Sequence, residues 1–378
     1  MIKAYNQAMR IGIDCRLPTY QMGGISQSVL QLVGALANLD SENDFILYHS
    51  RKEKHSFVPE GSVNFTRRNL WTPCHHSFER WTVAAELIGD NLEVFHSPDF
   101  IPPVSGAKRR IITVHDLNFL YFPEFLTRES RRYYSDQIEW AVNAADHIAV
   151  DSHATKNDVI NLLTVPREKI TTVHLAANSL YEQEFPKALV EKTLNRYDLA
   201  PGFILFVGTL EPRKNLPMIL HVYAIMRQER LVDVPFILIG NKGWMYEDVF
   251  AAIEDLNLQG KVRNLTGIRD EELAHFYHAA GVLVTPSHYE GFGLPALEAQ
   301  HCGCPVVVSN RGSLPEIVGD GGVILDPEDI RSWIDTLALV LNDKDMQKNM
   351  IQIGKAQARK FSWQKTARQM SAIYQDKL

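Results

Sequence analysis

Short apolar runs alternate with longer amphipathic stretches along most of this chain. The short runs predict buried strands, and the longer stretches predict helices with one apolar face. In the first half, the expected strands are 10–14, 45–49, 92–96, 111–115, 147–150 and 169–174. The expected helices between them are 25–38, 78–88, 128–145 and 155–163. This alternation is typical of a parallel sheet covered by helices.

The same pattern restarts after a polar stretch with prolines, residues 182–201, which we interpret as a linker. The expected strands of the second half are 203–208, 236–240, 262–265, 281–285 and 305–308, and a helix is expected at 271–280. A chain of 378 residues also exceeds what one hydrophobic core usually supports. The sequence therefore predicts an α/β protein with two Rossmann-like domains.

Composition excludes several classes of protein. No apolar run approaches the roughly 18 residues that a membrane span needs, and the amino end does not resemble a secretory signal. Four cysteines in so long a chain provide no disulfide framework, so we expect a cytosolic location. The net charge of −6 argues against a nucleic-acid partner, because nucleic-acid binding needs a basic surface.

Ligands of open parallel sheets bind beyond the carboxyl ends of the strands, so the loops there are the candidate sites. The loop 17–24 ends in Gly23 and Gly24, where a backbone without Cβ atoms can approach a phosphate or sugar closely. A plain tight turn is the alternative. His115 ends an expected strand, where it can bond to a sugar hydroxyl or, alternatively, to nearby backbone.

The loop "GTLEPRKN", residues 208–215, carries Arg213 and Lys214 into a helix start. A planar guanidinium and a compact ammonium together can hold a diphosphate, although a solvated basic turn would look the same. The loop 266–270, which contains Arg269, is a candidate for contact with a nucleobase. A simple capped turn is the alternative there.

The stretch "EGFGLPALEA", residues 290–299, places Glu290 in a glycine-rich loop and Glu298 near the start of an expected helix. Carboxylates accept strong hydrogen bonds from hydroxyl groups and would repel phosphate. This pattern favours a ligand with many hydroxyls, such as a sugar or ribose. The alternative is a solvent-facing Glu290 and a Glu298 that only complements a helix dipole.

Taken together, the glycine pair, His115, "GTLEPRKN" and "EGFGLPALEA" resemble the family 4 retaining glycosyltransferases, over nearly the whole chain. The resemblance implies the GT-B fold, in which two Rossmann-like domains face each other across a cleft that binds a nucleotide-sugar. "FSW" at 361–363 is similar to the place where the last helix of that fold crosses back. The implied domains are 1–185 plus 362–378 on the acceptor side and 186–361 for the nucleotide-sugar.

The resemblance also implies roles for the candidate residues. Glu290 would hold the donor sugar, Glu298 the ribose, and Arg213 with Lys214 the diphosphate. His115 would lie beside the donor sugar.

The remaining candidates would bind substrate mainly through backbone groups. These are Gly23 and Gly24, which would approach the phosphates, together with Arg269, Phe292, Gly293 and Leu294.

The implied activity is retaining transfer of a hexosyl group from UDP-glucose, GDP-mannose or a similar donor to a glycan or lipid-linked glycan in cell-surface polysaccharide assembly. "FHSPDF" and "TVHDLNFLYFPE" further resemble bacterial members with that role. A nucleotide-sugar epimerase or hydrolase, or a non-catalytic relative, is the alternative. Arg213 and Lys214 would stabilise the departing diphosphate in a front-face reaction.

No metal or other cofactor is expected. The one D-x-D sequence, residues 343–345, lies in a polar stretch between expected helices, and Cys302 with Cys304 lacks a second ligand pair. His275 and His278 have no nearby acid or cysteine in the sequence to complete a site.

Two segments, 67–81 and 128–140, mix arginines with aromatic residues. Their aromatic faces could stack on a sugar chain, or the segments could rest on an anionic membrane that carries a lipid-linked acceptor. An ordinary helix with a solvated basic face is the alternative. Peripheral contact with the inner face of the plasma membrane therefore stays open at this point.

Overall fold

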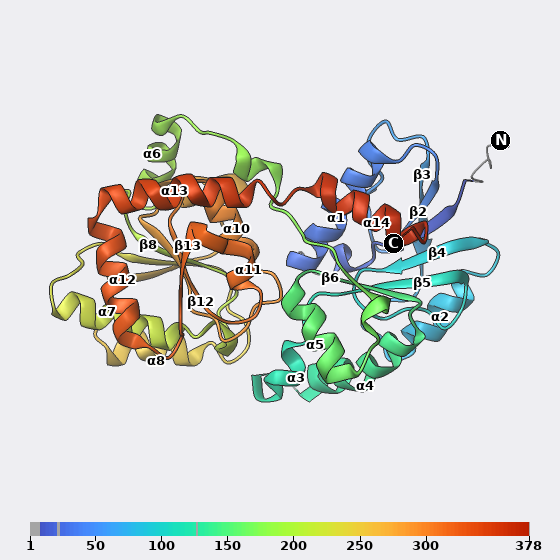
Figure 1. Cartoon of the computed structure of the whole chain (residues 1–378), viewed down its shortest axis with the longest axis horizontal. Helices are drawn as coiled ribbons and strands as arrows, with labels where there is room; N and C mark the ends of the chain where they lie inside the picture. The colour runs from blue at the N-terminus through green and yellow to red at the C-terminus, as the bar shows by residue number, and fades with distance from the viewer. Residues whose placement is uncertain (1–7, 21–22, 126–127, 378) are drawn as a thin grey trace. The chain divides into compact units, whose positions relative to one another are not determined.

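The computed structural model describes residues 8–20, 23–125 and 128–377, and the side chains of 128–132 lie outside that description. The chain divides into two compact units, each a sheet flanked by helices (Figure 1). Unit 1 consists of Met1–Leu120, Arg128–Leu175 and Ser362–Leu378, and unit 2 consists of Tyr121–Thr127 and Ala176–Phe361.

Unit 1 contains a seven-stranded parallel sheet with the strand order β3-β2-β1-β4-β5-β6-β7. Its strands are β1 (Arg10–Asp14), β2 (Asp44–Ser50), β3 (Phe65–Leu70), β4 (Leu92–Ser97), β5 (Ala107–Val114), β6 (His147–Val150) and β7 (Ile170–Thr172). The strand order reverses between β1 and β4. Such a switch point is where open parallel sheets bind ligands.

Helices cover both faces of this sheet. They are α1 (Gly24–Leu39), α2 (Glu79–Glu86), α3 (Asn118–Tyr121), α4 (Arg128–Ala144), α5 (His153–Leu163) and α14 (Trp363–Tyr374). α1 packs against α14, whose Met370 and Ile373 enter the same buried cluster as Ile11 of β1. The last helix of the chain therefore completes the core of unit 1.

Unit 2 contains a six-stranded parallel sheet with the order β10-β9-β8-β11-β12-β13. Its strands are β8 (Ile204–Val207), β9 (Phe236–Ile239), β10 (Val262–Leu265), β11 (Val282–Thr285), β12 (Val306–Ser309) and β13 (Gly322–Leu325). The strands β8, β9, β11 and β12 are almost entirely apolar, as expected for the central strands of a sheet buried on both faces. The switch point lies between β8 and β11.

The helices of unit 2 are α6 (Lys187–Arg196), α7 (Leu216–Gln228), α8 (Glu247–Asp255), α9 (Asp270–Ala279), α10 (Leu294–His301), α11 (Leu314–Val318), α12 (Ile330–Asn342) and α13 (Lys344–Ala358). Single 3-10 turns occur in both units, at 17–19, 123–125, 167–169, 179–182, 212–214 and 319–321. Trp333 of α12 is fully buried with Phe206 and Leu220, and its indole N–H donates to the Asp326 carbonyl at 3.0 Å.

The expected strands and helices are present, with ends shifted by a few residues, but the sequence did not predict β3 and β13. Both are edge strands. β3 contains polar residues such as Thr66 and Arg67, so it forms no continuous apolar run. Most residues of β13 are only half-buried. An edge strand needs fewer apolar residues than a central one, so its signal is weaker.

The stretch 182–201, which we interpreted as a linker, contains a helix that the sequence did not predict. Residues 187–196 form α6, which buries Val190 and Leu194 and packs against α9. The division between the units falls after Leu175 and after Phe361, so the stretch belongs to unit 2.

In the part of the chain that the structure describes, no helix is long and apolar enough to cross a membrane. The four cysteines are free thiols, and three of them, Cys15, Cys302 and Cys304, are buried.

Candidate active site

Two of the predicted loops meet at the switch point of unit 2. They are the basic loop, residues 208–215 with Arg213 and Lys214, and the glutamate loop, which contains Glu290. The first follows β8 and forms the 3-10 turn Pro212–Lys214, and the second follows β11. His288 N–H donates to the Arg213 carbonyl at 2.8 Å, which joins the two loops through their backbones. Parallel neighbours in the sheet thus bring together residues that are far apart in sequence.

Glu290 is the centre of this arrangement. Its carboxylate accepts from Arg213 Nη1 at 3.0 Å, from Lys214 Nζ at 2.7 Å and from Ser287 Oγ at 2.6 Å. Burial by itself raises the pKa of Glu290, but the charges of Lys214 and Arg213 outweigh it and lower the pKa to about 2. Glu290 is therefore ionised at neutral pH, and it is an ion-pair partner rather than a solvent-facing loop acid.

Arg213 is held from three sides. Beyond Glu290, its guanidinium donates to Glu211 Oε1 at 2.7 Å and to the Tyr289 carbonyl at 2.6 Å. Glu211 is itself buried. These contacts fix the plane of the guanidinium before any ligand binds, which reduces the entropy lost on binding.

Two glycines shape the loop around Glu290. Gly312 has a φ of +57°, and a Cβ there would lie 2.3 Å from the Glu290 carbonyl oxygen. Gly293 has a φ of +94° and directly precedes α10, where a Cβ would lie 2.8 Å from Leu314. Only glycine fits these positions without moving the loop.

Glu298 lies in α10 and has different surroundings from Glu290. Tyr277 Oη donates to its Oε2 at 2.9 Å. Burial and repulsion from Asp270 raise the pKa of Glu298 to about 7, and the Tyr277 bond only partly offsets them. A carboxylate with this pKa exchanges a proton near neutral pH, and the structure places no cation beside it among the residues described.

The remaining candidate residues of unit 2 lie at the start of α9 and around the start of α10. Arg269 precedes α9 with an exposed side chain that pairs with Glu272 at 3.5 Å. Phe292 is buried with its ring edge-on to Phe361, and Leu294 is the first residue of α10. The side chain of Phe292 is therefore used in packing.

His115 lies in unit 1, just after β5. Its Nδ1 lies 2.6 Å from Asp151 Oδ2 and its Nε2 lies 2.8 Å from the Pro98 carbonyl. Burial lowers the pKa of His115, but the charge and hydrogen bond of Asp151 outweigh it and raise the pKa to about 9. Because both neighbours accept hydrogen bonds, His115 is an imidazolium that donates from both ring nitrogens.

The glycine pair is at the start of α1. Gly23 is its N-cap in an extended conformation, and Gly24 is exposed. A Cβ at Gly24 would meet nothing within 4 Å, so packing within the described chain does not require a glycine there. Residues 21 and 22 of this loop lie outside the described residues.

The candidates for metal binding have structural partners. Asp343 caps α13 by accepting from the backbone N–H groups of Asp345 and Met346. His275 Nδ1 lies 2.8 Å from Thr193 Oγ1, and His278 Nε2 lies 3.2 Å from the Gln183 carbonyl. Their contacts are those of residues that hold α9 against its neighbours.

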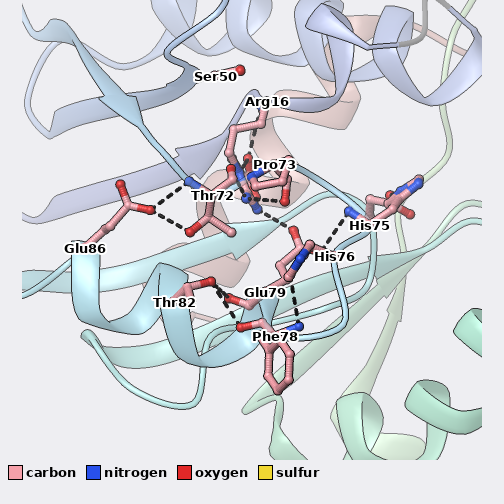
Figure 2. Close-up of polar contacts among 12 residues, drawn as sticks. Arg16, Ser50, Thr72, Pro73, His75, His76, Phe78, Glu79, Thr82 and Glu86 are labelled. Atoms are coloured by element: carbon pink, nitrogen blue, oxygen red, sulfur yellow. Dashed lines mark hydrogen bonds and ion pairs between the residues drawn. The ribbon is translucent and has the colours of Figure 1, made fainter.

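Sequence reasoning missed a polar cluster at the switch point of unit 1. Arg16 is almost fully buried and pairs with Asp14 at 2.5 Å. It also pairs with Glu79 at 2.5 Å (Figure 2). His75 pairs with Asp99 in the same region. Asp14 ends β1, and Asp99 lies two residues beyond the end of β4. Because ligands bind at the carboxyl ends of parallel strands, these positions are the signal that could have found the cluster.

Comparisons with known proteins identify the family of this chain. The sequence model described as "Glycosyltransferase Family 4" matches residues 22–178, and "Glycosyl transferases group 1" matches residues 194–357. The chain is 35% identical over 282 residues to O-antigen chain mannosyltransferase B of Escherichia coli, and the alignment covers 74% of each protein.

Solved structures share the architecture. WaaG, a glycosyltransferase involved in lipopolysaccharide biosynthesis, matches with a TM-score of 0.75 and 14% identity, over 96% of this chain and 99% of WaaG. Anabaena Alr3699/HepE in complex with UDP-glucose matches with a TM-score of 0.73 and 14% identity, over 97% of this chain and 100% of that one. The chain belongs to the family 4 glycosyltransferases and has the GT-B fold.

Proposed function

We propose that this glycosyltransferase moves a hexosyl group from a nucleotide-diphosphate sugar to a glycan or lipid-linked glycan acceptor in cell-surface polysaccharide biosynthesis, with retention of the anomeric configuration. The similarity to an O-antigen mannosyltransferase supports mannose, with GDP-mannose as donor and UDP-glucose as the alternative. The observation that carries the proposal is the cluster of Arg213, Lys214 and Glu290 at the switch point of unit 2.

Arg213 and Lys214 bind the diphosphate of the donor and stabilise the negative charge that develops as it leaves. The leaving phosphate oxygen takes the acceptor's proton in a front-face reaction, so these two cations supply the electrostatic stabilisation without a metal. Glu290 holds both cations in place and accepts from hydroxyls of the donor sugar. Its ionised state makes it a strong acceptor for those hydroxyls.

Other residues bind the rest of the donor. Glu298 accepts from the ribose hydroxyls, and the backbone of Phe292, Gly293 and Leu294 faces the sugar and phosphate. Arg269, exposed before α9, contacts the nucleobase. Gly24 approaches the phosphates, which fits a glycine at a position where no packing within its own unit requires one.

His115 lies beside the donor sugar, and its positive charge is fixed by Asp151. An imidazolium at this position favours the negatively charged leaving group and not the developing positive charge on the sugar. We therefore assign His115 an electrostatic role toward the diphosphate and not that of a general base, because its ring has no free lone pair while both nitrogens donate.

A thermal-shift panel of nucleotide-sugars tests the donor first, since a ligand that binds only the folded chain raises its unfolding temperature. GDP-mannose should stabilise most. Acceptor-dependent product formation then separates a transferase from an epimerase or hydrolase, which would release an epimer or free sugar without any acceptor. Activity that persists in excess EDTA supports metal independence, whereas loss reversed only by a divalent ion contradicts it.

We also propose that the enzyme works in the cytoplasm and touches the inner face of the plasma membrane through unit 1. The supporting surface consists of Trp71, Phe78 and Trp81, all exposed, with Arg51 stacked on Trp71 and Arg80 on Trp81. Aromatic rings beside cations suit the interface of an anionic bilayer. Flotation with anionic vesicles should carry the wild type but not Trp71→Ser/Trp81→Ser, and equal flotation would contradict the contact.

A further inference from the structure

Tyr277 lies in the last turn of α9 and contacts Glu298 of the neighbouring helix α10. Its hydroxyl donates to Glu298 Oε2 at 2.9 Å. The tyrosine is fully buried, and burial raises its pKa well above the usual range, so the phenol is a neutral donor. Tyr277 therefore connects the buried part of unit 2 with the glutamate proposed to bind ribose.

Packing holds the ring of Tyr277 in place. The ring of Tyr181 meets it edge-on, with the centroids 5.7 Å apart and an angle of 76° between the planes. Tyr181 belongs to the 3-10 turn Ser179–Glu182 and is itself buried. Because a close-packed buried side chain stays in one rotamer, the hydroxyl of Tyr277 remains directed at the same carboxylate.

The two oxygens of Glu298 have different surroundings. Oε2 accepts from Tyr277, whereas Oε1 has no hydrogen-bond partner among the residues that the structure describes. Glu298 as a whole is only half-buried. A carboxylate that is fixed through one oxygen can offer the other to a hydroxyl group of a ligand.

Few groups act on the charge of Glu298. Asp270 at the start of α9 disfavours the ionised carboxylate, and the bond from Tyr277 favours it. Tyr181 and Cys302 also lie near. Burial and the charge of Glu298 raise the pKa of both, so both are neutral at neutral pH.

The other helices packed on α10 contribute little. Among the described residues, α11 and α13 add no charged group to those that act on Glu298. Lys355 of α13 lies beside Gly303, beyond the end of α10, and pairs with Glu184 at 3.3 Å. The protonation of Glu298 therefore depends on burial and on the two groups of α9.

From this geometry we propose that Tyr277 is a positioning residue for donor binding: its hydroxyl holds Glu298 by one oxygen and selects the ionised carboxylate, whose other oxygen accepts from the ribose. A hydrogen bond to an ionised acceptor is stronger than one between neutral groups. Without the hydroxyl, burial and Asp270 act unopposed, and the glutamate keeps its proton to higher pH. The inference rests on the proposed role of Glu298 toward ribose.

Tyr277→Phe removes the hydroxyl and keeps the ring. At pH 7 it should bind the donor about fivefold more weakly than the wild type does. Near pH 9 the two affinities should almost coincide, because the carboxylate is then ionised in both proteins. In steady-state kinetics the variant should raise KM at pH 7 and leave kcat nearly unchanged, as expected for a contact that is kept throughout the reaction.

Tyr223→Phe in α7 is the matched control. Tyr223 is also buried in unit 2, and its hydroxyl donates to the Val234 carbonyl at 2.8 Å. The control loses a buried hydrogen bond of the same kind, so its unfolding temperature should fall to a similar extent. Its donor affinity should match the wild type at both pH values. Tyr277→Phe added to Glu298→Gln should leave the flat pH profile of that variant unchanged.

Calorimetry from pH 6 to pH 9 with GDP-mannose and with UDP-glucose measures these affinities. Intact nucleotide-sugars are the right probes, because a terminal phosphate would itself gain a proton near about pH 6. In the ligand-free protein, NMR of carbon-13-labelled glutamate follows the carboxyl group of Glu298, whose signal is the one missing from Glu298→Gln. Its titration midpoint should rise by about one pH unit in Tyr277→Phe and stay in place in Tyr223→Phe.

The two readouts separate this inference from the proposed function. If neither nucleotide-sugar binds to the wild type, the proposed function fails, whereas the titration of Glu298 still decides the role of Tyr277. If donors bind and Tyr277→Phe moves the midpoint and the pH profile no more than Tyr223→Phe does, only the positioning role is wrong. A loss of affinity that is the same at pH 7 and pH 9 would also overturn it, because such a loss reflects packing and not the charge of the carboxylate.

Discussion

Arg213 Nη1 lies 3.0 Å from Glu290 Oε2, although the two residues are 77 positions apart in sequence. Lys214 completes the contact by placing its Nζ 2.7 Å from the other oxygen of the same carboxylate. The groups proposed to hold the diphosphate and the sugar therefore form one ion-paired unit. A change to one of them will alter the others.

Glu290→Gln should lower both stability and kcat. The pKa of Glu290 is depressed from 4.5 to about 2, so its stabilising contribution is fully present above pH 4.5 and is lost as the pH falls towards 2. At neutral pH we expect a loss of about 3 kcal/mol in the free energy of unfolding, measured by urea denaturation.

The same variant should not weaken nucleoside-diphosphate binding, because Arg213 and Lys214 keep their charges and lose a counter-charge. Calorimetry beside steady-state kinetics tests this, with the exposed Glu328→Gln as control. A diphosphate affinity that falls as steeply as kcat would contradict the role of Glu290 toward the sugar.

Lys214→Ala and Arg213→Ala should both lower kcat, but they should differ in how much stability they lose. Each should reduce kcat by about two orders of magnitude if the diphosphate contacts resemble oxyanion-type donors. Arg213→Ala additionally leaves the buried Glu211 without its partner, so we expect a further loss of about 3 kcal/mol in stability. Near-normal turnover of both variants would reduce the loop to a structural turn.

Gly312→Ala should disrupt the glutamate loop. Its Cβ would lie 2.3 Å from the Glu290 carbonyl, and its φ of +57° is unfavourable for alanine. Gly260→Ala is the matched control in the same unit, because Gly260 also has a positive φ, +73°, but a Cβ there meets nothing within 4 Å. The control should lose about 1 kcal/mol, and Gly312→Ala clearly more, together with donor binding. If both variants lost the same amount of stability, the close contact between the new Cβ and the Glu290 carbonyl would be shown to cost little.

Donor affinity should depend on pH through Glu298. Its pKa of about 7 means that the carboxylate gains a proton as the pH falls through neutrality, and the protonated form accepts from ribose hydroxyls less well. The Kd for an intact nucleotide-sugar should rise by up to about tenfold per pH unit below pH 7 in the wild type. Glu298→Gln should bind more weakly above pH 7 and show a flat profile. A flat wild-type profile would place the ribose elsewhere.

Asp151→Asn should remove a pH-dependent part of the stability of unit 1. The pKa of His115 is raised from 6.5 to about 9, so the stabilisation by its positive charge is fully present below pH 6.5 and is lost as the pH rises through 9. The wild type should therefore exceed Asp151→Asn by about 3 kcal/mol at pH 6.5, and the difference should shrink towards pH 9. A constant difference, measured by urea denaturation at both pH values, would argue against a charged His115.

The central strands could be read from sequence because each is a short, continuous apolar run, as in Val306–Ser309. The edge strand β3 could not, since half of its residues face solvent or polar neighbours. α6 was missed for a related reason. Only one narrow face of this helix is buried, and it includes Val190 and Leu194. The prolines on either side of the helix are also typical of a linker.

The candidate site was predictable as a set of residues but not as a set of contacts. Arg213 and Glu290 were predicted as site residues because each follows an expected strand. Their ion pair could not be predicted, because it depends on which strands are neighbours in the sheet. The pKa of Glu298 depends on burial and on Tyr277 and Asp270, which belong to another helix.

The return of the last helix to unit 1 has a consequence for biosynthesis. α14 supplies Met370, Ile373 and Tyr374 to a core whose other members, such as Ile11 and Val33, leave the ribosome much earlier. At roughly 5 to 20 residues per second, the intervening unit takes on the order of ten seconds or more to be made. During that interval the apolar residues of unit 1 that α14 covers in the folded chain lack this partner, so the core of the first unit is completed only after the second unit has been made.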